Sequence, residues 1–459
     1  MKTFISWQIL IYLRFFAKLA LIFSNPKIIG ITGSVGKSST RNALDAILRE
    51  ISPTKTIFEG NSETGIPLGI LGLPIYDYAP LDWLRILALT PFKIFNLVGI
   101  RYLVVEMGID DPLPPKNMAY LLTIVKPHIS VFLNVYPVHT EQFEKNLENT
   151  GKLLNKEKST QLLSSIAYEK GKIITDNPQC EVAIYSAGNT YVQQVIHESK
   201  KDDGKKTYLS FGEEKNNSLS FVSYSIDLQG CSFIFSKNRK VYEVVIEKYL
   251  LPRVYREVFA AALLVSDALH IDLKLACSAL STHFTPPKGR ASIFEGINHC
   301  IIIDSSYNAS RGSVLAFLDM VGELKKKHKG EIVFLFGDMG ELGGEAQKEH
   351  EEVVKYVTGS VDYLYCVGPL TQKYVVPFVE SSTSNHESET KKVLWFDNSK
   401  KAGEHLKTHL PKNSIVFVKG SQNGIFLEEA IKYILKNPDD KRKLCRQTDY
   451  WMKRKATFF

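Results

Sequence analysis

Short apolar runs rich in β-branched residues alternate with longer stretches of helical periodicity along most of the chain. Apolar strands separated by helix-length segments are typical of parallel sheets with crossover helices. The runs form two sets with a long gap between them. We predict strands at 28–32, 103–106 and 129–134 in the first set, and at 301–304, 332–336, 363–367 and 415–419 in the second.

The gap between the two sets has a different pattern. A helical piece is predicted over 254–269, and the polar stretch 191–245 contains alternating runs that predict antiparallel strands. Two consecutive prolines begin the segment 286–290 and cannot continue a helix. This segment is therefore a natural domain boundary.

Length and composition exclude a single small binding module and a disordered or fibrous protein. With 459 residues, 44% hydrophobic and 23% charged, the chain has enough apolar material for two or three globular domains. Its six cysteines lie far apart, without C-x-x-C or zinc-site spacing. We therefore expect buried thiols in a reducing compartment.

The net charge of +8 lies at the two ends of the chain. Residues 1–27 carry +4 and residues 439–459 another +4, so the segment between them is neutral. We find no nucleic-acid-binding motif and expect no nucleic acid as a partner. Basic residues beside aromatic ones suit an anionic membrane surface, so we expect salt-sensitive peripheral contact through both ends.

The apolar N-terminal run 4–23 is interrupted by Arg14 and Lys18. Two central bases would make a membrane-spanning helix costly. The run predicts an amphipathic helix that lies either on a membrane or on the body of the protein, and both alternatives stay open.

The strongest local motif is a glycine-rich turn that follows a predicted strand and opens a helix. In Gly30-Ile-Thr-Gly-Ser-Val-Gly-Lys-Ser-Ser-Thr40, backbone N–H groups at the helix start can bind phosphate. Lys37 would neutralise phosphate charge and Ser38 would bind Mg²⁺. The alternative is a glycine-rich turn that binds nothing.

Two further polar groups follow predicted strands, at the edge where ligands of open α/β sheets bind. Glu106 ends the run 103–106, and Asn134 and His139 come after 129–134. Alone, Glu106 could be a surface charge and His139 a loop histidine. Their position downstream of the phosphate loop favours a metal–nucleotide site.

Further motifs follow in order along the chain: Asn61-Ser-Glu-Thr-Gly-Ile-Pro67, Val105-Glu-Met-Gly108, Glu157-Lys158, Gly289-Arg290, Asp304-Ser-Ser-Tyr-Asn-Ala309, Gly337-Asp-Met-Gly-Glu-Leu-Gly343 and Lys419-Gly-Ser421. With the phosphate loop, this series resembles the ATP-dependent Mur ligases of peptidoglycan synthesis. The Ser-Tyr-Asn-Ala and Gly-Asp-Met-Gly-Glu-Leu-Gly runs resemble the type that adds D-alanyl-D-alanine.

The resemblance implies an α/β fold, in which a P-loop ATPase domain with a parallel sheet and a small antiparallel part precedes a Rossmann-like domain. The domains expected are a basic amphipathic N-terminal segment (1–27), a central ATP-binding domain (28–292), a C-terminal domain (293–438) and a basic tail (439–459).

The resemblance also implies a reaction that uses ATP and Mg²⁺. ATP would phosphorylate the peptide carboxylate of a muramoyl-peptide acceptor, and the amine of D-alanyl-D-alanine would attack the acyl phosphate. Such chemistry depends mainly on phosphate binding, metal ions and positioning of two substrates.

Residue roles come from the resemblance, motif by motif. Catalytic roles fall to Lys37, Glu106, His139 and Lys158. ATP contacts fall to Gly33, Ser34, Val35, Gly36, Lys37, Ser38, Ser39, Arg290, Asp304 and Asn308. Mg²⁺ would be held by Ser38, Glu106, His139 and a carbamylated Lys158, and the substrates by Asn61, Thr64, Asp338 and Glu341.

Some of these residues keep a second interpretation. Lys158 could be an exposed helix lysine, and Asp338 with Glu341 could form a turn that only caps the next helix. Gln422 stands where an arginine commonly follows Lys-Gly-Ser in the family.

The chain departs from the family pattern at its start. These ligases begin with a domain that binds the uridine nucleotide, and here residues 1–26 precede the first predicted strand. Either nucleotide recognition comes from elsewhere, or the acceptor is a lipid-linked muropeptide or a polyglutamate. A non-catalytic ATP-binding scaffold is a third alternative. We expect a cytoplasmic monomer, with peripheral contact at the inner face of the membrane left open.

Overall fold

The computed structural model describes residues 2–58, 60–76, 79–137, 140–149, 158–202, 205–247, 249–340, 342, 345–357, 359–384, 392–421 and 424–459. The chain divides into two compact units. The N-terminal unit comprises Met1–Ser223, Phe233–Val244 and Tyr255–Thr285, and the C-terminal unit comprises Tyr224–Ser232, Val245–Val254 and Pro286–Phe459.

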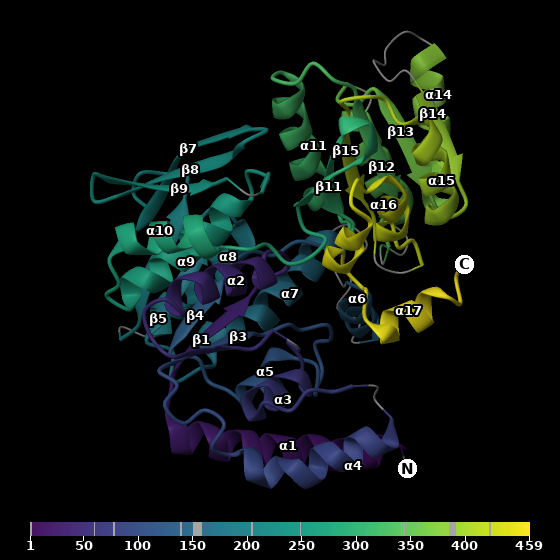
Figure 1. Cartoon of the computed structure of the whole chain (residues 1–459). Coiled ribbons are helices and arrows are strands. Elements are labelled where there is room, and N and C mark those ends of the chain that lie inside the picture. Colours follow the sequence, from purple (N-terminus) through teal and green to yellow (C-terminus); the bar gives the residue numbers. More distant parts are fainter. Residues whose placement is uncertain are drawn as a thin grey trace. The chain divides into compact units, whose positions relative to one another are not determined.

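The three strands of the first predicted set lie next to one another in a nine-stranded sheet (Figure 1). Its spatial order is β2-β3-β1-β4-β5-β6-β7-β8-β9. The strands are β1 (Lys27–Thr32), β2 (Thr54–Thr56), β3 (Tyr102–Glu106), β4 (Ile129–Phe132), β5 (Val182–Ser186), β6 (Thr207–Gly212), β7 (Leu219–Asp227), β8 (Gly230–Lys237) and β9 (Lys240–Ile246).

The central strands are parallel and buried on both faces, as their continuous apolar runs predicted. β1 lies between β3 and β4, with Ile31 paired to Glu106 on one side and to Val131 on the other. The carboxyl ends of these three strands therefore lie at one edge of the sheet, where the phosphate loop begins.

The predicted antiparallel region 191–245 needs a correction in two places. Residues 190–202 form a helix, because their apolar positions recur at helical spacing, and β6 pairs in parallel with β5 and β7. Only the β7-β8-β9 part is antiparallel, since two-residue turns join these neighbouring strands.

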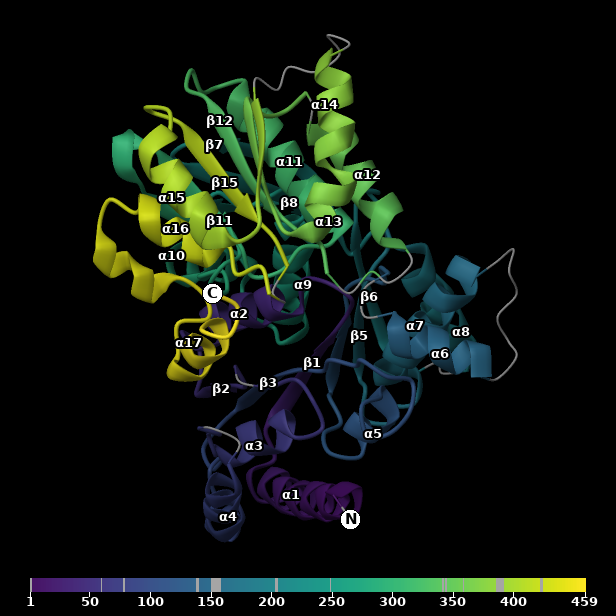
Figure 2. The same cartoon turned by 90° about the vertical axis from the view of Figure 1, so that its right-hand side faces the viewer.

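Helices of the N-terminal unit pack into two groups around the sheet, seen from two sides in Figures 1 and 2. α2, α9 and α10 pack on one another, and α7 packs on both α5 and α8. The helices are α1 (Lys2–Ser24), α2 (Lys37–Leu48), α3 (Gly65–Leu71), α4 (Pro80–Leu89), η1 (Thr90–Lys93), α5 (Met118–Leu122), α6 (Glu141–Asn149), α7 (Lys158–Thr175), α8 (Thr190–Asp202), α9 (Tyr255–Ala268) and α10 (Leu273–His283).

The N-terminal helix α1 is docked on the body of this unit along one stripe. Leu10, Leu13, Ala17 and Ala20 are buried in the main apolar core at spacings of three and four residues. Within α1, Ser6–Ser24 is long and apolar enough to cross a membrane by length and composition, and 22% of it is buried in the structure.

The C-terminal unit contains a six-stranded sheet in the order β10-β11-β15-β12-β13-β14. β10 is an antiparallel edge strand, and the other five strands run parallel. β11, β12, β13 and β15 are largely buried, whereas β14 at the other edge is only half-buried. The elements are β10 (Ser292–Glu295), η2 (Ile297–His299), β11 (Ile301–Ser305), α11 (Arg311–Lys325), β12 (Ile332–Gly337), α12 (Ala346–Val357), β13 (Tyr363–Val367), α13 (Pro369–Tyr374), α14 (Val376–Ser384), β14 (Lys392–Phe396), α15 (Ser399–His409), β15 (Ile415–Lys419), α16 (Glu428–Ile434), η4 (Pro438–Lys443) and α17 (Asp449–Lys455).

The end of the chain, which includes the predicted basic tail 439–459, is packed within the C-terminal unit. The Phe458 ring lies 5.3 Å from the ring of Phe426. Arg446 and Lys455 are buried and both form ion pairs with Glu428. Part of the positive charge assigned to this end is therefore neutralised inside the fold.

Candidate active site

The phosphate loop joins the carboxyl end of β1 to the start of α2. Gly33 and Gly36 have φ values of 149° and 88°, which favour glycine over residues with a side chain. The loop is fastened to the strand end of β4: Ser34 N donates to Asn134 O (2.9 Å), and Val35 N donates to Asn134 Oδ1 (2.9 Å). These two hydrogen bonds fix the loop that precedes α2 to the residues after β4.

Lys37 and Ser38 leave this loop in different directions. Lys37 Nζ donates to the carbonyl oxygens of Gly33 (2.7 Å) and Ser34 (3.2 Å), so the ammonium group lies over the loop. Ser38 Oγ donates to Glu106 Oε2 at 2.9 Å. The structure therefore brings together the loop and the strand-end carboxylate that the sequence pointed to.

Glu106 is buried and receives further donors that the motif did not indicate. Arg41 Nη1 lies 3.2 Å from Glu106 Oε2, and Asn61 Nδ2 donates to Glu106 Oε1 at 3.2 Å. Arg41 lies three residues after Ser38 on α2, so both reach the same carboxylate. That spacing was the only sequence signal for Arg41.

The other side of the loop is anchored by a second, half-buried acid. Asn134 Nδ2 donates to Glu257 Oε2 at 3.4 Å, and burial raises the pKa of Glu257 above its ordinary value. Ser34 Oγ and Tyr136 exchange two hydrogen bonds, of 2.9 and 3.1 Å. Sequence reasoning found Asn134 but not Glu257, which comes from α9.

A buried lysine lies within electrostatic range of the phosphate loop. Lys170 on α7 is buried, and burial together with the positive charge of Lys37 lowers its pKa to about 7. Asp110, which follows β3, acts in the opposite direction. No sequence motif singled out this residue.

Several predicted residues lie at or outside the edge of the described structure. His139 and Glu341 are outside the described residues. Lys158 is the first residue of α7, and the structure describes nothing of its side chain. Thr64 is half-buried at the N-cap of α3, without a side-chain capping hydrogen bond.

A second polar cluster lies in the C-terminal unit, at the carboxyl ends of β11 and β15. Asp304 is fully buried, and burial raises the pKa of its carboxyl to about 6. Ser306 N donates to its Oδ1, whereas its Oδ2 has no hydrogen-bond partner among the described residues. A buried acceptor without a partner is rare and marks a place for a ligand donor.

Lys419 completes this cluster. Its Nζ donates to Asn308 O at 2.9 Å, and burial together with nearby Arg290 lowers its pKa to about 7. The Arg290 guanidinium lies over the ring of Tyr307, 4.8 Å from its centroid. Arg290, Asp304 and Asn308 are therefore neighbours within this unit, as the motifs suggested.

Asp338, predicted to contact the incoming amine, is buried and lies close to the start of α13. Its two carboxylate oxygens accept from Leu370 N (3.0 Å) and Thr371 N (2.8 Å), at the start of α13. His350 Nε2 accepts from Met339 N at 3.1 Å. The Asp338 carboxylate therefore caps α13 and not α12, the next helix after the turn, so its role toward the substrate stays a prediction.

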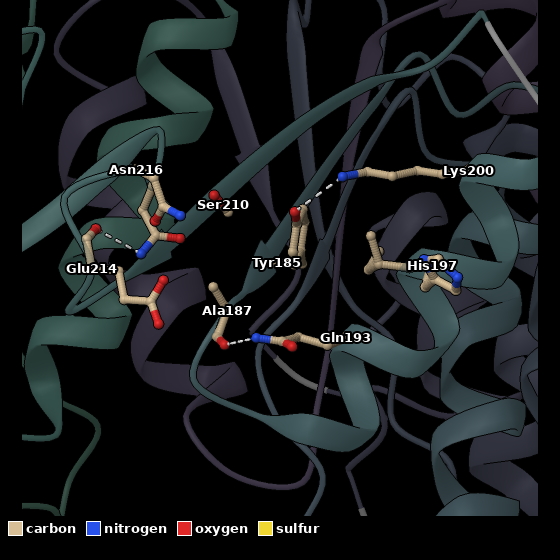
Figure 3. Close-up of a pocket in the computed structure, with 10 residues that line it drawn as sticks. Tyr185, Ala187, Gln193, His197, Lys200, Ser210, Glu214 and Asn216 are labelled. Carbon is tan, nitrogen blue, oxygen red and sulfur yellow. Dashed lines mark hydrogen bonds between the residues drawn. The ribbon is translucent and has the colours of Figure 1, made fainter.

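A separate surface cavity of about 350 Å³ lies beside β5, α8 and β6 (Figure 3). Tyr185, Lys200 and Glu214 are among the residues that line it, and Lys200 Nζ lies 3.4 Å from Tyr185 Oη. It contains none of the predicted site residues.

The side chains beside the phosphate loop include oxygen donors of the kind that Mg²⁺ prefers. Within the described ranges no group of three or more His, Cys, Asp or Glu side chains could hold a metal ion. Ser38 and Glu106 do place a hydroxyl and a carboxylate oxygen 2.9 Å apart beside the phosphate loop. Mg²⁺ commonly uses one or two protein oxygens together with phosphate and water, so these residues fit it.

Comparison with known families gives a match in the C-terminal unit. Residues 289–422 match the family model of the Mur ligase, glutamate ligase domain. The chain is 25% identical over 415 residues to the UDP-N-acetylmuramoyl-tripeptide–D-alanyl-D-alanine ligase of Rickettsia prowazekii, covering 89% of this chain and 78% of that protein. It is 24% identical to the Escherichia coli enzyme of the same name, covering 71% and 61%.

Solved structures share the fold. MurF from Acinetobacter baumannii aligns with a TM-score of 0.67 and 21% identity, covering 91% of this chain and 78% of that one. MurF ligase from Thermotoga maritima in complex with ADP aligns with a TM-score of 0.66 and 20% identity, covering 97% and 84%. These likenesses confirm the predicted α/β architecture.

Proposed function

We propose that the chain is a member of the Mur ligase family and acts as an ATP-dependent, ADP-forming ligase that adds D-alanyl-D-alanine to a muramoyl tripeptide. Its relatives from Rickettsia and Escherichia are named for that reaction, and their alignments cover most of this chain. The motifs specific to the D-alanyl-D-alanine-adding type support the same acceptor and amine.

In the N-terminal unit we assign the ATP phosphates to Gly33–Ser39. The N–H groups at the head of α2 and the Lys37 ammonium provide positive potential for the phosphate oxygens. Ser38 and Glu106 are assigned to Mg²⁺, which when bound would neutralise phosphate charge. Asn61 and Thr64, near that edge of the sheet, are assigned to the acceptor.

In the C-terminal unit we assign further ATP contacts to Arg290, Asp304 and Asn308. The free Oδ2 of Asp304 is an acceptor suited to a hydroxyl donor such as that of a ribose. His139 and a carbamylated Lys158 remain proposed metal ligands, and Glu341 remains a proposed contact of the incoming amine.

One observation carries the proposal: Ser38 Oγ, at the start of the helix after the phosphate loop, donates to the strand-end carboxylate of Glu106 at 2.9 Å. In a glycine-rich turn that binds nothing, no carboxylate from the neighbouring strand would be required beside the first turn of the following helix. Hydroxyl, carboxylate and Lys37 ammonium together make a site suited to a metal-bound polyphosphate.

The test is ADP release and amide formation by the purified chain with ATP, Mg²⁺, UDP-linked muramoyl tripeptide and D-alanyl-D-alanine. Lys37→Ala is expected to lower turnover by at least about a hundredfold, because it removes the charge facing the phosphates. Lys126→Ala is the matched control, since Lys126 is exposed at the opposite edge of the sheet, before β4, and should keep parental activity.

A parallel assay supplies a lipid-linked muropeptide and a polyglutamate in place of the UDP-linked acceptor. If an amide forms with the lipid-linked muropeptide or the polyglutamate but not with the UDP-linked tripeptide, the acceptor that reacts would replace the proposed one. Full turnover of Lys37→Ala would contradict the catalytic account altogether.

A further inference from the structure

The outer side of α1 is an exposed apolar stripe. Trp7, Ile11, Phe15 and Ile22 are all exposed and recur at helical spacing, with exposed Lys18 within the same stripe. The docked stripe of the helix lies on its other side. An amphipathic helix usually presents polar residues to water, so this helix, apolar on both sides, needs a second partner.

A second stripe runs along α4 and η1. Leu81, Leu84, Phe92 and Phe95 are exposed, again three or four residues apart when exposed Ala88 is included. Exposed fractions of 63% for Leu84 and 79% for Phe92 exclude a supporting role in the core. Two independent segments of the chain therefore present apolar side chains outward.

The two stripes are neighbours in the fold. Tyr12 Oη donates to Leu87 O at 2.9 Å, and the rings of Phe23 and Phe95 lie 5.5 Å apart. Both views of the N-terminal unit show α1 and α4 together at the edge of this unit (Figures 1 and 2). We call this surface the α1–α4 face.

The charges of the α1–α4 face have one sign. Residues 6–24 and 79–101 contain five basic residues and a single acidic one, Asp82. Asp82 is buried and accepts from Arg85 and from Tyr76 N, so it adds no negative charge to the surface. Lys18 and Arg101 are exposed.

From these observations we propose that the α1–α4 face binds the surface of an anionic lipid bilayer, with α1 lying in the interfacial plane. Exposed aromatic and aliphatic side chains would enter the acyl boundary, and the surrounding bases would face lipid phosphates. A second copy of the chain does not fit, because two such faces would bring like charges together. This proposal does not rest on the ligase activity.

The experiment is co-sedimentation of the full chain with vesicles of phosphatidylcholine, alone or with about a third phosphatidylserine. We expect binding to the anionic vesicles, weakened by salt. Leu84→Asp with Phe92→Asp should lower the bound fraction at least about tenfold, because it places carboxylates in the lipid contact. Leu275→Asp is the matched control: Leu275 is also 63% exposed, on α10, and should bind within about twofold of the parent.

Each result decides. Selective loss in the α4 double variant, with an unchanged circular dichroism spectrum, supports the α1–α4 face. Equal binding of both variants, or binding indifferent to phosphatidylserine, overturns it. So does a stable dimer that the double variant abolishes, since the face would then be covered by a second copy. Resistance of the bound chain to alkaline extraction would show that α1 spans the bilayer and would also overturn it.

Discussion

Arg446 offers the sharpest test of how the C-terminal unit is held together. Its guanidinium donates to both carboxylate oxygens of Glu428, at 2.7 and 2.5 Å. It also donates to the carbonyl oxygens of Ser306 and Tyr307, each at 2.8 Å. Removing it as Arg446→Leu would take away four hydrogen bonds at once and leave Glu428 facing Lys455 alone.

The expected cost follows from burial. The side chains of Arg446 and Glu428 are 2% and 0% exposed, so water cannot replace the lost partner. Breaking a buried ion pair by removing one partner costs about 3–5 kcal/mol. For a folding unit of this size that corresponds to a decrease in Tm of roughly 6–20 °C.

The assay is urea and thermal unfolding of the full chain, compared with Lys453→Ala, a change at an exposed base on α17, the helix that follows Arg446 and carries Lys455. The control should unfold within about 0.5 kcal/mol of the parent. At temperatures where the variant is folded, KM for ATP should rise, because the carbonyls that Arg446 fixes lie between Asp304 and Asn308. A variant as stable as the control would refute the argument.

Two further predictions concern pH. Burial raises the pKa of Asp304 from 3.8 to about 6, so its charged form destabilises the fold above pH 6 and this effect vanishes below pH 3.8. The variant Asp304→Asn should therefore be up to about 3 kcal/mol more stable at neutral pH, while losing ATP turnover. A gain in stability that does not grow with pH in urea titrations would contradict this. Burial lowers the pKa of His350, whose Nδ1 donates to Ala346 O, so the unfolded chain takes up the proton first and the stability of the fold should fall as pH drops below 6.5. The variant His350→Gln should flatten that decline. An unchanged profile of stability against pH would mean that other groups cause the decline.

The sequence was most informative where one local pattern determines the structure. The run 332–336 is apolar throughout and predicts a strand buried on both faces, which β12 is. The residues 207–211 were misjudged because alternation reports burial of one face and says nothing about whether the neighbouring strand is parallel.

The same distinction applies to the site. Lys37 and Ser38 lie in one contiguous motif, which the sequence displays directly. Glu257 and Lys170 act on that loop from α9 and α7, and Arg446 reaches Glu428 only after the chain end folds back. Such contacts form between segments that are far apart in the sequence, so the spacing of residues within a motif does not predict them.

The contacts of Glu106 explain why the phosphate loop alone specifies too little. A buried carboxylate is costly unless donors surround it, and Ser38, Arg41 and Asn61 supply them from α2 and from the segment before α3. Arg41 pairs with Oε2 of Glu106 and Asn61 donates to its Oε1, so donors from two segments hold the carboxylate in place. Lys37, by contrast, bonds neutral loop carbonyls, which charged phosphate oxygens would replace with stronger acceptors. The loop therefore combines one group that is fixed beforehand with one that exchanges partners when a nucleotide arrives.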